Sequence, residues 1–466
     1  MGNVRTLLAA FAVLLALGGC GGGGADEPEG GQADRRLTVW ILEDQPDRLR
    51  ATRANVARFA KAGGFEVDVV PIGDDELAGR VAVAASRGLL PDVLQLPMAS
   101  AHAYAREGML SRDAAQDVVD RLGEETFSAR ALSLMTSEGT VTAVPSDAWG
   151  QLLIYRKDLF AGAGLRAPRT LEDVRRAARR LKRPLRAGVA IATAPTPFTA
   201  ETFEHVALAA NCELLNDAGA VALTSPECMR AFEIYVELAR TAPRATGQDV
   251  ESTRDDYFAG EAAMVFWSPF LLDAMAGMRD EAIPTCPQCR EDPAFLARSS
   301  GLVGPLEGAA GAPAQFGTIS AWGITSDANM EGARQLVEYL MSDGYLRWLG
   351  LAPQGKFPVR TGDGAEPDRY VAAWARLPSG VARKAPLSRF YGAESIAAFG
   401  DGARTLQRWG FEQDGAALVG ALRGPEPVAR ALAAAVAGTL TPAAAAEQAQ
   451  AAVERLADKV AARGGG

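Results

Sequence analysis

Residues 65–96, FEVDVVPIGDDELAGRVAVAASRGLLPDVLQL, contain the pattern that decides the fold. Two short apolar runs, 65–72 and 92–96, are typical of strands, and the segment 77–86 between them has the apolar spacing of a helix. A strand, a helix and a second strand in this order are typical of neighbouring parallel strands that are joined by a helix on one face of the sheet.

The same alternation extends upstream of this stretch. Residues 37–42 form a β-rich run, and 49–59 have helical spacing. We therefore predict an α/β fold with a mostly parallel sheet covered by helices on both faces. Ligands in such folds bind beyond the carboxyl ends of the strands, so the loops at 43–46 and 97–100, and the residues that follow 141–145, are the places to look for a site.

A second α/β block begins near Trp149. Thr170 is the expected N-cap of a helix in this block, because Asp173 stands at the capping-box position three residues later. The other elements that we expect are strands at 151–155, 264–266 and 318–324, a helix over 332–341, and helices from Arg430 to the end of the chain, the last of them opened by Pro442.

Composition narrows the classes of function. The chain has 466 residues, 48% hydrophobic and 23% charged, as expected for a globular protein of two or three domains. The formal net charge of −9 argues against nucleic acid as the main partner. The chain has only two histidines, His102 and His205, which are too few for a histidine-rich metal site. We expect neither a metal nor a cofactor. We expect His102 to be a capping or surface residue.

The N-terminus has the pattern of a processing signal. Arg5 precedes an apolar run over 7–17, which is too short to span a bilayer, and small residues then lead to Cys20. This pattern resembles the lipobox of bacterial lipoproteins, in which the signal peptide, here 1–19, is removed and the new N-terminal cysteine carries lipid such as palmitate. Residues 20–36 would then be a flexible tether. An ordinary signal peptide with an incidental cysteine is the alternative.

Four cysteines remain after lipidation. Export places them in an oxidising compartment, where disulfides are expected, and four cysteines allow three connectivities. We favour Cys212 with Cys228 and Cys286 with Cys289, because each pair is close in sequence. The spacing of the second pair also permits a redox or zinc site, but the prolines around it are typical of a loop, not of the start of a helix.

Four stretches resemble the sugar-binding family of extracellular solute-binding proteins from ABC importers. PDVLQLPMASAHAYAREGML (91–110) is similar to the family's strand, ligand loop and following helix, and VPSDAWGQLLIYRKDLFAGAGLRAPRTLEDV (144–174) to its lobe crossing. FAGEAAMVFWSPFL (258–271) resembles a Gly-x-Ala-Ala-Met segment with an aromatic loop, and GKFPVR (355–360) a Gly-x-x-Pro-x-Arg element. The resemblance covers roughly residues 37–463.

The resemblance implies a two-lobed periplasmic-binding-protein-like fold with the ligand in a cleft between lobes joined by several crossings. Lobe I would comprise 37–146 and 316–356, and lobe II 147–315 and 357–466. The protein would be a monomer, lipid-anchored on the extracytoplasmic face of the cell membrane, that delivers a saccharide to a permease. Because the chain has no Gly-x-x-x-x-Gly-Lys-[Ser/Thr] motif, the ATPase of that importer must be another polypeptide.

Sugar binding requires aromatic rings for the apolar sugar faces and polar side chains for the hydroxyls. The loops matched to the family's ligand segments contain Trp149 and Trp267, and we expect Phe266 to face the core. We take Trp348, Trp374 and Trp409 as helix-packing residues. The full set of candidate ligand-binding residues is Trp40, Glu43, Asp44, Asp147, Trp149, Trp267, Trp322, Arg360 and Tyr391.

Two other classes of function stay open. A tethered carbohydrate-active enzyme would need two carboxylates on either side of one glycosidic bond, and Glu43 and Asp147 are the candidates. A sensory or adhesion lipoprotein would use the same two-lobed fold without a transporter. The resemblance favours a binding protein that is not an enzyme.

Overall fold

The computed structural model describes residues 35–464 except 44, 74–75 and 310–311. The expected signal peptide, Cys20, most of the tether and Asp44 lie outside the described residues. Of the described residues, 36–464 belong to one compact unit. No helix in the described part of the chain combines the length and the apolar character that a membrane span requires.

The larger sheet is mixed, which corrects the expectation of a mostly parallel sheet. β1 runs parallel to β2 and β3, whereas β10 runs antiparallel to β3 and β6, and β11 antiparallel to β6. The strands β1, β2 and β3 are parallel because helices connect them, and β6 runs in the same direction. Only β10, which enters from the second sheet, and β11 run the other way. The order across the sheet is β11 (Phe357–Pro358), β6 (Val144–Gly150), β10 (Gly317–Ile324), β3 (Val93–Pro97), β1 (Arg36–Ile41) and β2 (Glu66–Pro71).

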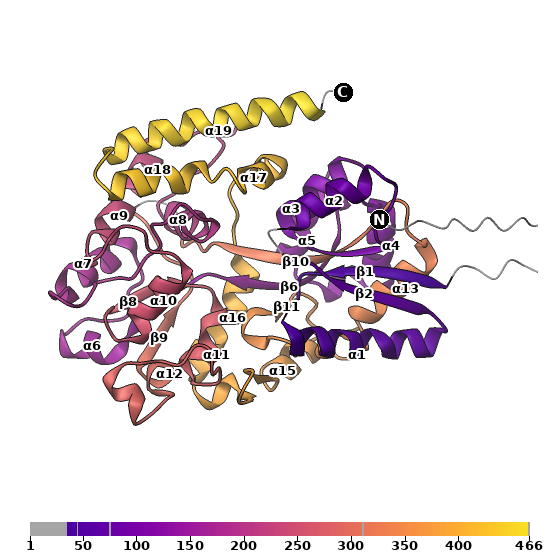
Figure 1. Cartoon of the computed structure of the whole chain (residues 1–466), viewed down its shortest axis with the longest axis horizontal. Helices are drawn as coiled ribbons and strands as arrows, with labels where there is room; N and C mark the ends of the chain where they lie inside the picture. Colours follow the sequence, from indigo (N-terminus) through magenta and orange to yellow (C-terminus); the bar gives the residue numbers. More distant parts are fainter. Residues whose placement is uncertain (1–34, 44, 74–75, 310–311, 465–466) are drawn as a thin grey trace, which may run out of the picture. The chain divides into compact units, whose positions relative to one another are not determined.

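Amphipathic helices cover this sheet (Figure 1). Ala333, Leu336, Val337 and Leu340 of α13 are buried, as their spacing predicts. Together with the sheet they build the first hydrophobic core. The helices and short strands of this region are α1 (Pro46–Gly63), α2 (Leu77–Ala85), α3 (Met98–Arg106), α4 (Arg112–Leu122), α5 (Ala129–Met135), β4 (Thr136–Ser137), β5 (Thr140–Val141), α13 (Met330–Leu340), α14 (Tyr345–Leu349) and α15 (Arg369–Trp374).

The smaller sheet is antiparallel, with β7 (Leu152–Arg156) between β8 (Met264–Trp267) and β9 (Ser300–Val303). The Thr170 side chain caps α7 (Leu171–Leu181), and Asp173 completes the capping box, as predicted. A second hydrophobic core lies between this sheet and its helices. The remaining elements are α6 (Lys157–Gly162), α8 (Pro197–Ala209), α9 (Pro226–Ala239), α10 (Val250–Phe258), α11 (Leu272–Met275), α12 (Phe295–Ser299), β12 (Pro378–Ser379), β13 (Ala385–Pro386), α16 (Ala393–Thr405), α17 (Ala416–Leu422), α18 (Pro427–Val436) and α19 (Pro442–Gly464), with 3-10 turns at Glu124–Thr126, Pro269–Leu271, Pro287–Arg290, Pro353–Gly355 and Leu387–Arg389.

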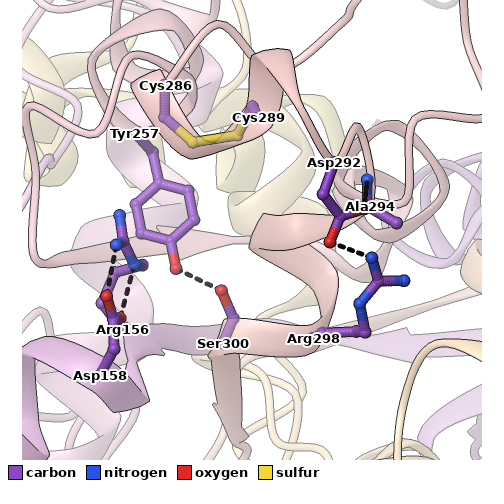
Figure 2. The surroundings of a disulfide bond; sticks show 9 residues. All are labelled: Arg156, Asp158, Tyr257, Cys286, Cys289, Asp292, Ala294, Arg298 and Ser300. Carbon is purple, nitrogen blue, oxygen red and sulfur yellow. Dashed lines mark hydrogen bonds and ion pairs between the residues drawn. A yellow bond between two sulfur atoms is a disulfide. The ribbon is translucent and has the colours of Figure 1, made fainter.

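Both expected disulfides form, Cys212–Cys228 and Cys286–Cys289. Figure 2 shows Tyr257 beside the second bond, with its hydroxyl 2.7 Å from that of Ser300. Cys286 and Cys289 are buried, so a partner thiol cannot approach their sulfur atoms. The Cys-Pro-Gln-Cys segment is therefore a structural disulfide and not an exposed redox motif.

The connections between the two sheets meet at one place. The Gln151 amide donates to the Phe316 carbonyl at 2.8 Å, and the Gln315 side-chain amide donates to the Gln151 carbonyl at 2.7 Å. A third segment joins them, because the Gln407 amide donates to the Gln315 carbonyl at 2.8 Å. Gly317 packs between two of these segments: a Cβ atom there would lie 2.5 Å from the Leu406 Cβ and 2.7 Å from the Trp149 carbonyl oxygen.

We predict that Gly317→Ala lowers the free energy of unfolding by about 1–3 kcal/mol, because the added methyl group overpacks these crossings. Gly79→Ala in α2 is the matched control, since no atom lies within 4 Å of the position that its added methyl group would take. That change should stabilise the protein by about 0.4–1 kcal/mol. Urea denaturation measures both variants, and equal stability of Gly317→Ala and the parent chain would contradict the tight packing at the crossings.

Candidate functional site

A cavity of about 400 Å³ lies at the carboxyl ends of β1 and β3. The sequence predicts ligand loops at this edge of the sheet, at 43–46 and 97–100. The cavity wall contains residues from both parts of the fold, which the connections between the two sheets join. The lining side chains that matter for ligand chemistry are Glu43, Arg48, Gln95, Asp147, Trp149, Glu201, Phe270, Ser320, Lys356, Arg408 and Arg423.

Buried charges form one end of this cavity. The Lys356 Nζ lies 2.8 Å from the Glu43 Oε1 and 3.8 Å from the Asp147 Oδ2, and all three side chains are buried. The Arg48 Nη1 lies 3.4 Å from the Glu43 Oε2. On its remaining side the Lys356 ammonium lies 4.1 Å from the centre of the Trp348 ring, at cation–π distance. Each buried charge in this group therefore has a partner of opposite sign.

The two carboxylates have opposite pKa shifts. Burial acts to raise the pKa of Glu43, but the charges of Lys356 and Arg48 outweigh it and hold that pKa below its usual value. Burial raises the pKa of Asp147 above its usual value, although Lys356 and the hydrogen bonds from Trp348 and Ser146 act in the other direction. The Trp348 Nε1 and the Ser146 hydroxyl donate to the Asp147 Oδ1 at 2.6 Å and 2.9 Å.

Aromatic rings form another part of the cavity wall. Trp149 is half-buried, and its ring makes edge contacts with Phe270 and Phe316 at centroid distances of 6.4 Å and 5.7 Å. Phe270, also half-buried, packs directly against Gly355, the residue before Lys356. The cavity therefore has half-exposed ring surfaces next to a set of hydrogen-bonding groups, as ligand pockets typically do.

Arg48 has unused hydrogen-bonding capacity at this site. Its Nε and Nη2 are buried and have no hydrogen-bond partner among the described residues. A buried donor without a partner costs about 1–3 kcal/mol. The side chain is therefore held in place by Glu43 with donors to spare, and a small rearrangement of the wall would make those donors available to a ligand.

The structure brings three of the predicted site residues together, namely Glu43, Asp147 and Trp149. Trp40 is half-buried in β1 and is not among the described residues that line the cavity. Trp267 in β8 is 7% exposed and packs on Phe198 at a centroid distance of 4.7 Å, also outside the described lining. Its neighbour Phe266 is fully buried, as predicted.

Three further candidates have interior partners of their own. Trp322 is buried against Trp348, with ring centres 4.8 Å apart. Arg360 donates from its Nη1 to the Met341 carbonyl at 2.7 Å and from its Nη2 to the Leu122 carbonyl at 2.9 Å. The hydroxyl of Tyr391 donates to the Leu272 carbonyl at 2.7 Å. These three residues are therefore core residues and are outside the cavity lining that the structure describes.

Lys356, Arg48 and Phe270 are site residues that the sequence reasoning missed. Lys356 and Phe270 lie inside two of the four family-like stretches, so a signal for them exists, but the sequence analysis predicts Arg360 in place of Lys356. His102 is buried in α3, so it is not a surface residue. Its Nε2 lies 2.8 Å from the carbonyl oxygen of Leu134 in the last turn of α5, which agrees with the capping alternative. No cluster of three or more potential metal ligands occurs in the described part of the chain.

Comparison with known proteins gives a consistent result. A family model described as bacterial extracellular solute-binding protein matches residues 44–346. The putative ABC transporter periplasmic-binding protein YcjN of Escherichia coli K12 is 27% identical over 352 residues, 72% of this chain and 77% of that protein.

Two solved structures have a similar fold. The sugar-binding protein MalE from Xanthomonas citri has a TM-score of 0.68 at 20% identity, covering 92% of this chain and 98% of the other. The GacH receptor of Streptomyces glaucescens, solved unliganded and with acarbose, has a TM-score of 0.68 at 17% identity, covering 90% and 98%. The chain therefore has the two-lobed α/β fold of these binding proteins.

The opposite pKa shifts predict opposite effects of pH on two variants. Glu43 contributes stability that is present above its unfolded pKa of about 4.3 and is lost as the pH falls through its lower folded pKa. The stability advantage of the parent chain over Glu43→Gln should therefore shrink below about pH 4. Asp147 binds its proton more tightly in the folded state, so relative to Asp147→Asn the parent chain should lose stability as the pH rises above about 4.

Chemical denaturation of the three proteins between acidic and neutral pH measures these differences. A difference for Glu43→Gln that grows on acidification, or the same trend for both variants, would contradict the arrangement of charges around Lys356.

Proposed function

Because the chain belongs to the family of bacterial extracellular solute-binding proteins, we propose that it captures a sugar or oligosaccharide for an ABC importer. The observation that carries the proposal is the cavity in which Trp149 and Phe270 lie beside the buried Glu43, Asp147 and Lys356. Its volume of about 400 Å³ is within the usual range of ligand pockets.

The two halves of this wall suit the two kinds of surface on a sugar. The C–H faces of a sugar ring are apolar and stack on aromatic rings, so we assign this role to Trp149 and Phe270. Hydroxyl groups donate and accept, and we assign them to the carboxylates of Glu43 and Asp147 and to the ammonium of Lys356. The solved relatives named above, one a sugar-binding protein and one an acarbose receptor, support this choice of ligand class.

The carboxylate arrangement favours binding over glycoside hydrolysis. A glycosidase needs one carboxyl group free to donate a proton and a second one free to attack or to activate water. Glu43 and Asp147 instead share Lys356, and Asp147 accepts two further hydrogen bonds. Groups held in this way can accept hydrogen bonds from a ligand without taking part in bond cleavage.

We further propose that the protein is a monomer, held at the extracytoplasmic face of the cell membrane by lipid on Cys20. The tether over 20–36 would let the folded body reach its permease. We keep the division into lobe I (37–146 and 316–356) and lobe II (147–315 and 357–466) as part of the proposal. Closure of such lobes on a ligand is a hinge motion, and the crossings at Gln151 and Gln315 are the places where it would occur.

The binding proposal predicts that the chain from residue 35 binds a saccharide reversibly and that Trp149→Ala weakens this binding by about 10- to 100-fold. The size follows from the roughly 1–3 kcal/mol that burial of a large apolar side chain contributes. Titration calorimetry against a panel of mono- and oligosaccharides measures the affinity.

The matched control is Phe232→Leu in α9. Phe232 is buried in the second core, and its ring packs on that of Phe203. It should lower stability and leave the affinity unchanged. If no saccharide of the panel binds, and a peptide or a metal binds tightly, the sugar assignment is refuted. Normal binding by Trp149→Ala would refute only the role of this ring.

The anchoring proposal predicts that Cys20→Ala moves the protein to the soluble fraction or leaves it as an unprocessed precursor, whereas the parent chain partitions into detergent. Phase separation of cell extracts followed by immunoblotting measures the distribution. Equal partitioning of both forms into detergent would place the anchor elsewhere.

A further inference from the structure

The strongest charge feature outside the cavity lies on α7 and its two flanking loops. Residues 166–186 contain nine Lys and Arg residues and only two acidic ones, Glu172 and Asp173, a net charge of +7. The remaining residues contain 39 basic and 55 acidic side chains, a net charge of −16. Positive charge is thus concentrated on one element of an acidic protein.

Most of this charge is not neutralised by neighbours. Arg175 and Arg179 pair with Glu172 and with Glu237 of α9, and Arg176 pairs with Asp173. Within the described ranges, no carboxylate lies at ion-pair distance from five exposed basic residues of this segment. These are Arg166, Arg169, Arg180, Lys182 and Arg183.

Helical spacing gathers these side chains on one side of α7. Arg176 and Arg180 are four residues apart and so lie on the same face, and Arg169 and Arg183 continue the stripe at either end. We call Arg166, Arg169, Arg176, Arg180, Lys182 and Arg183 the basic face. Figure 1 shows α7 at the left edge of the compact unit, and residues of the basic face are not among those described as lining the 400 Å³ cavity.

Two features of shape accompany the charge. At one end of α7 an open groove of about 540 Å³ is lined by Leu165, Arg166, Arg169 and Arg176. At the other end a tight turn presents Leu185, whose side chain is 82% exposed, between basic residues on both sides. Leu185 is thus a large apolar side chain that is exposed at the tip of a basic turn.

We propose that the basic face docks the protein on an anionic phospholipid bilayer. Lipid phosphates attract Lys and Arg side chains near the membrane surface, and the attraction falls off within a Debye length, about 8 Å at physiological ionic strength. The net negative charge of the other residues is screened wherever those residues lie farther than one Debye length from the membrane surface. The charge distribution therefore orients the protein with α7 toward the lipid, and Leu185 can enter the headgroup region.

A bilayer suits these features better than a structured protein partner does. A fluid layer of phosphates can adjust to long, mobile arginine side chains, whereas a protein interface of ordinary size has a packed apolar centre. The basic turn offers one large apolar side chain, Leu185, and half of the residues that line the groove at the opposite end of α7 are charged. Docking through α7 would add a second membrane contact to the lipid proposed at Cys20 and does not depend on the ligand of the cavity.

Vesicle co-sedimentation tests the proposal with the compact unit from residue 36, which lacks Cys20 and therefore carries no lipid. The vesicles contain phosphatidylcholine alone or phosphatidylcholine mixed with phosphatidylglycerol. The parent chain should bind the mixed vesicles, more weakly as salt rises, and should not bind the neutral ones. The triple variant Arg180→Ser, Lys182→Ser, Arg183→Ser should bind at least about tenfold more weakly, given the usual contribution of each basic side chain.

The matched control removes the same three charges from α1, as Arg50→Ser, Arg58→Ser, Lys61→Ser. These residues are exposed, and the control has the same net charge as the α7 variant. It should bind like the parent chain, and thermal melting checks that both variants are folded. Leu185→Ser should weaken binding without changing its salt dependence. Equal loss in the two triple variants, equal binding to neutral vesicles, or no vesicle binding by the folded parent chain would overturn the proposal.

Discussion

The cavity depends on the ammonium group of Lys356. It is buried, it lies 2.8 Å from Glu43 and 3.8 Å from Asp147, and it contacts the ring of Trp348. Removing a charge from water costs several kcal/mol unless close partners replace the lost hydration. The end of β1, the strand β6 and the segment before β11 must therefore keep their relative positions, because each supplies a member of this group. The polar wall of the cavity is therefore held in place by the chain's own charges.

The crossings between the two sheets impose a second constraint. Gln151, Gln315 and Gln407 are far apart in sequence, yet backbone and side-chain hydrogen bonds connect all three. Gly317 is small enough for the chain segments to approach at this point. Tight connections leave few residues that can change their backbone angles, so the hinge motion that we propose would be confined to these crossings. The aromatic and charged parts of the cavity wall lie close to them, since Trp149 stands two residues before Gln151.

Charge is used in two different ways in this protein. In the cavity the buried cations and carboxylates compensate one another, which keeps them fixed and available for hydrogen bonds. On α7 and its flanking loops, five exposed basic residues lack carboxylate partners within the part of the chain that the structure describes, which leaves a field that extends into solvent. The first arrangement suits an uncharged ligand rich in hydroxyl groups. The second suits a surface of phosphates, and neither region needs the other to operate.

Local signals in the sequence predicted local structure well. The Thr170 capping box, the apolar stripe of α13 and the Cys212–Cys228 bond depend on residues that are near in sequence, and the structure confirms all three. The order of strands and helices, with four family-like stretches, also identified the fold class and the family. Residues of the loop after β1 line the cavity, because the carboxyl ends of neighbouring parallel strands meet at one edge.

Tertiary structure decided what depends on distant partners. The reversed direction of β10 follows from its link to a second sheet, which strand spacing cannot reveal. Glu43 joins Lys356 across more than half of the chain, and a lone Lys in a sequence gives no sign that it will be buried between two carboxylates. Trp322 and Arg360 have the residue types of a sugar site, but packing against Trp348 and bonds to backbone carbonyls make them part of the core. A sequence sets which groups are available; burial and pairing, which fix their free energy, exist only once the chain has folded.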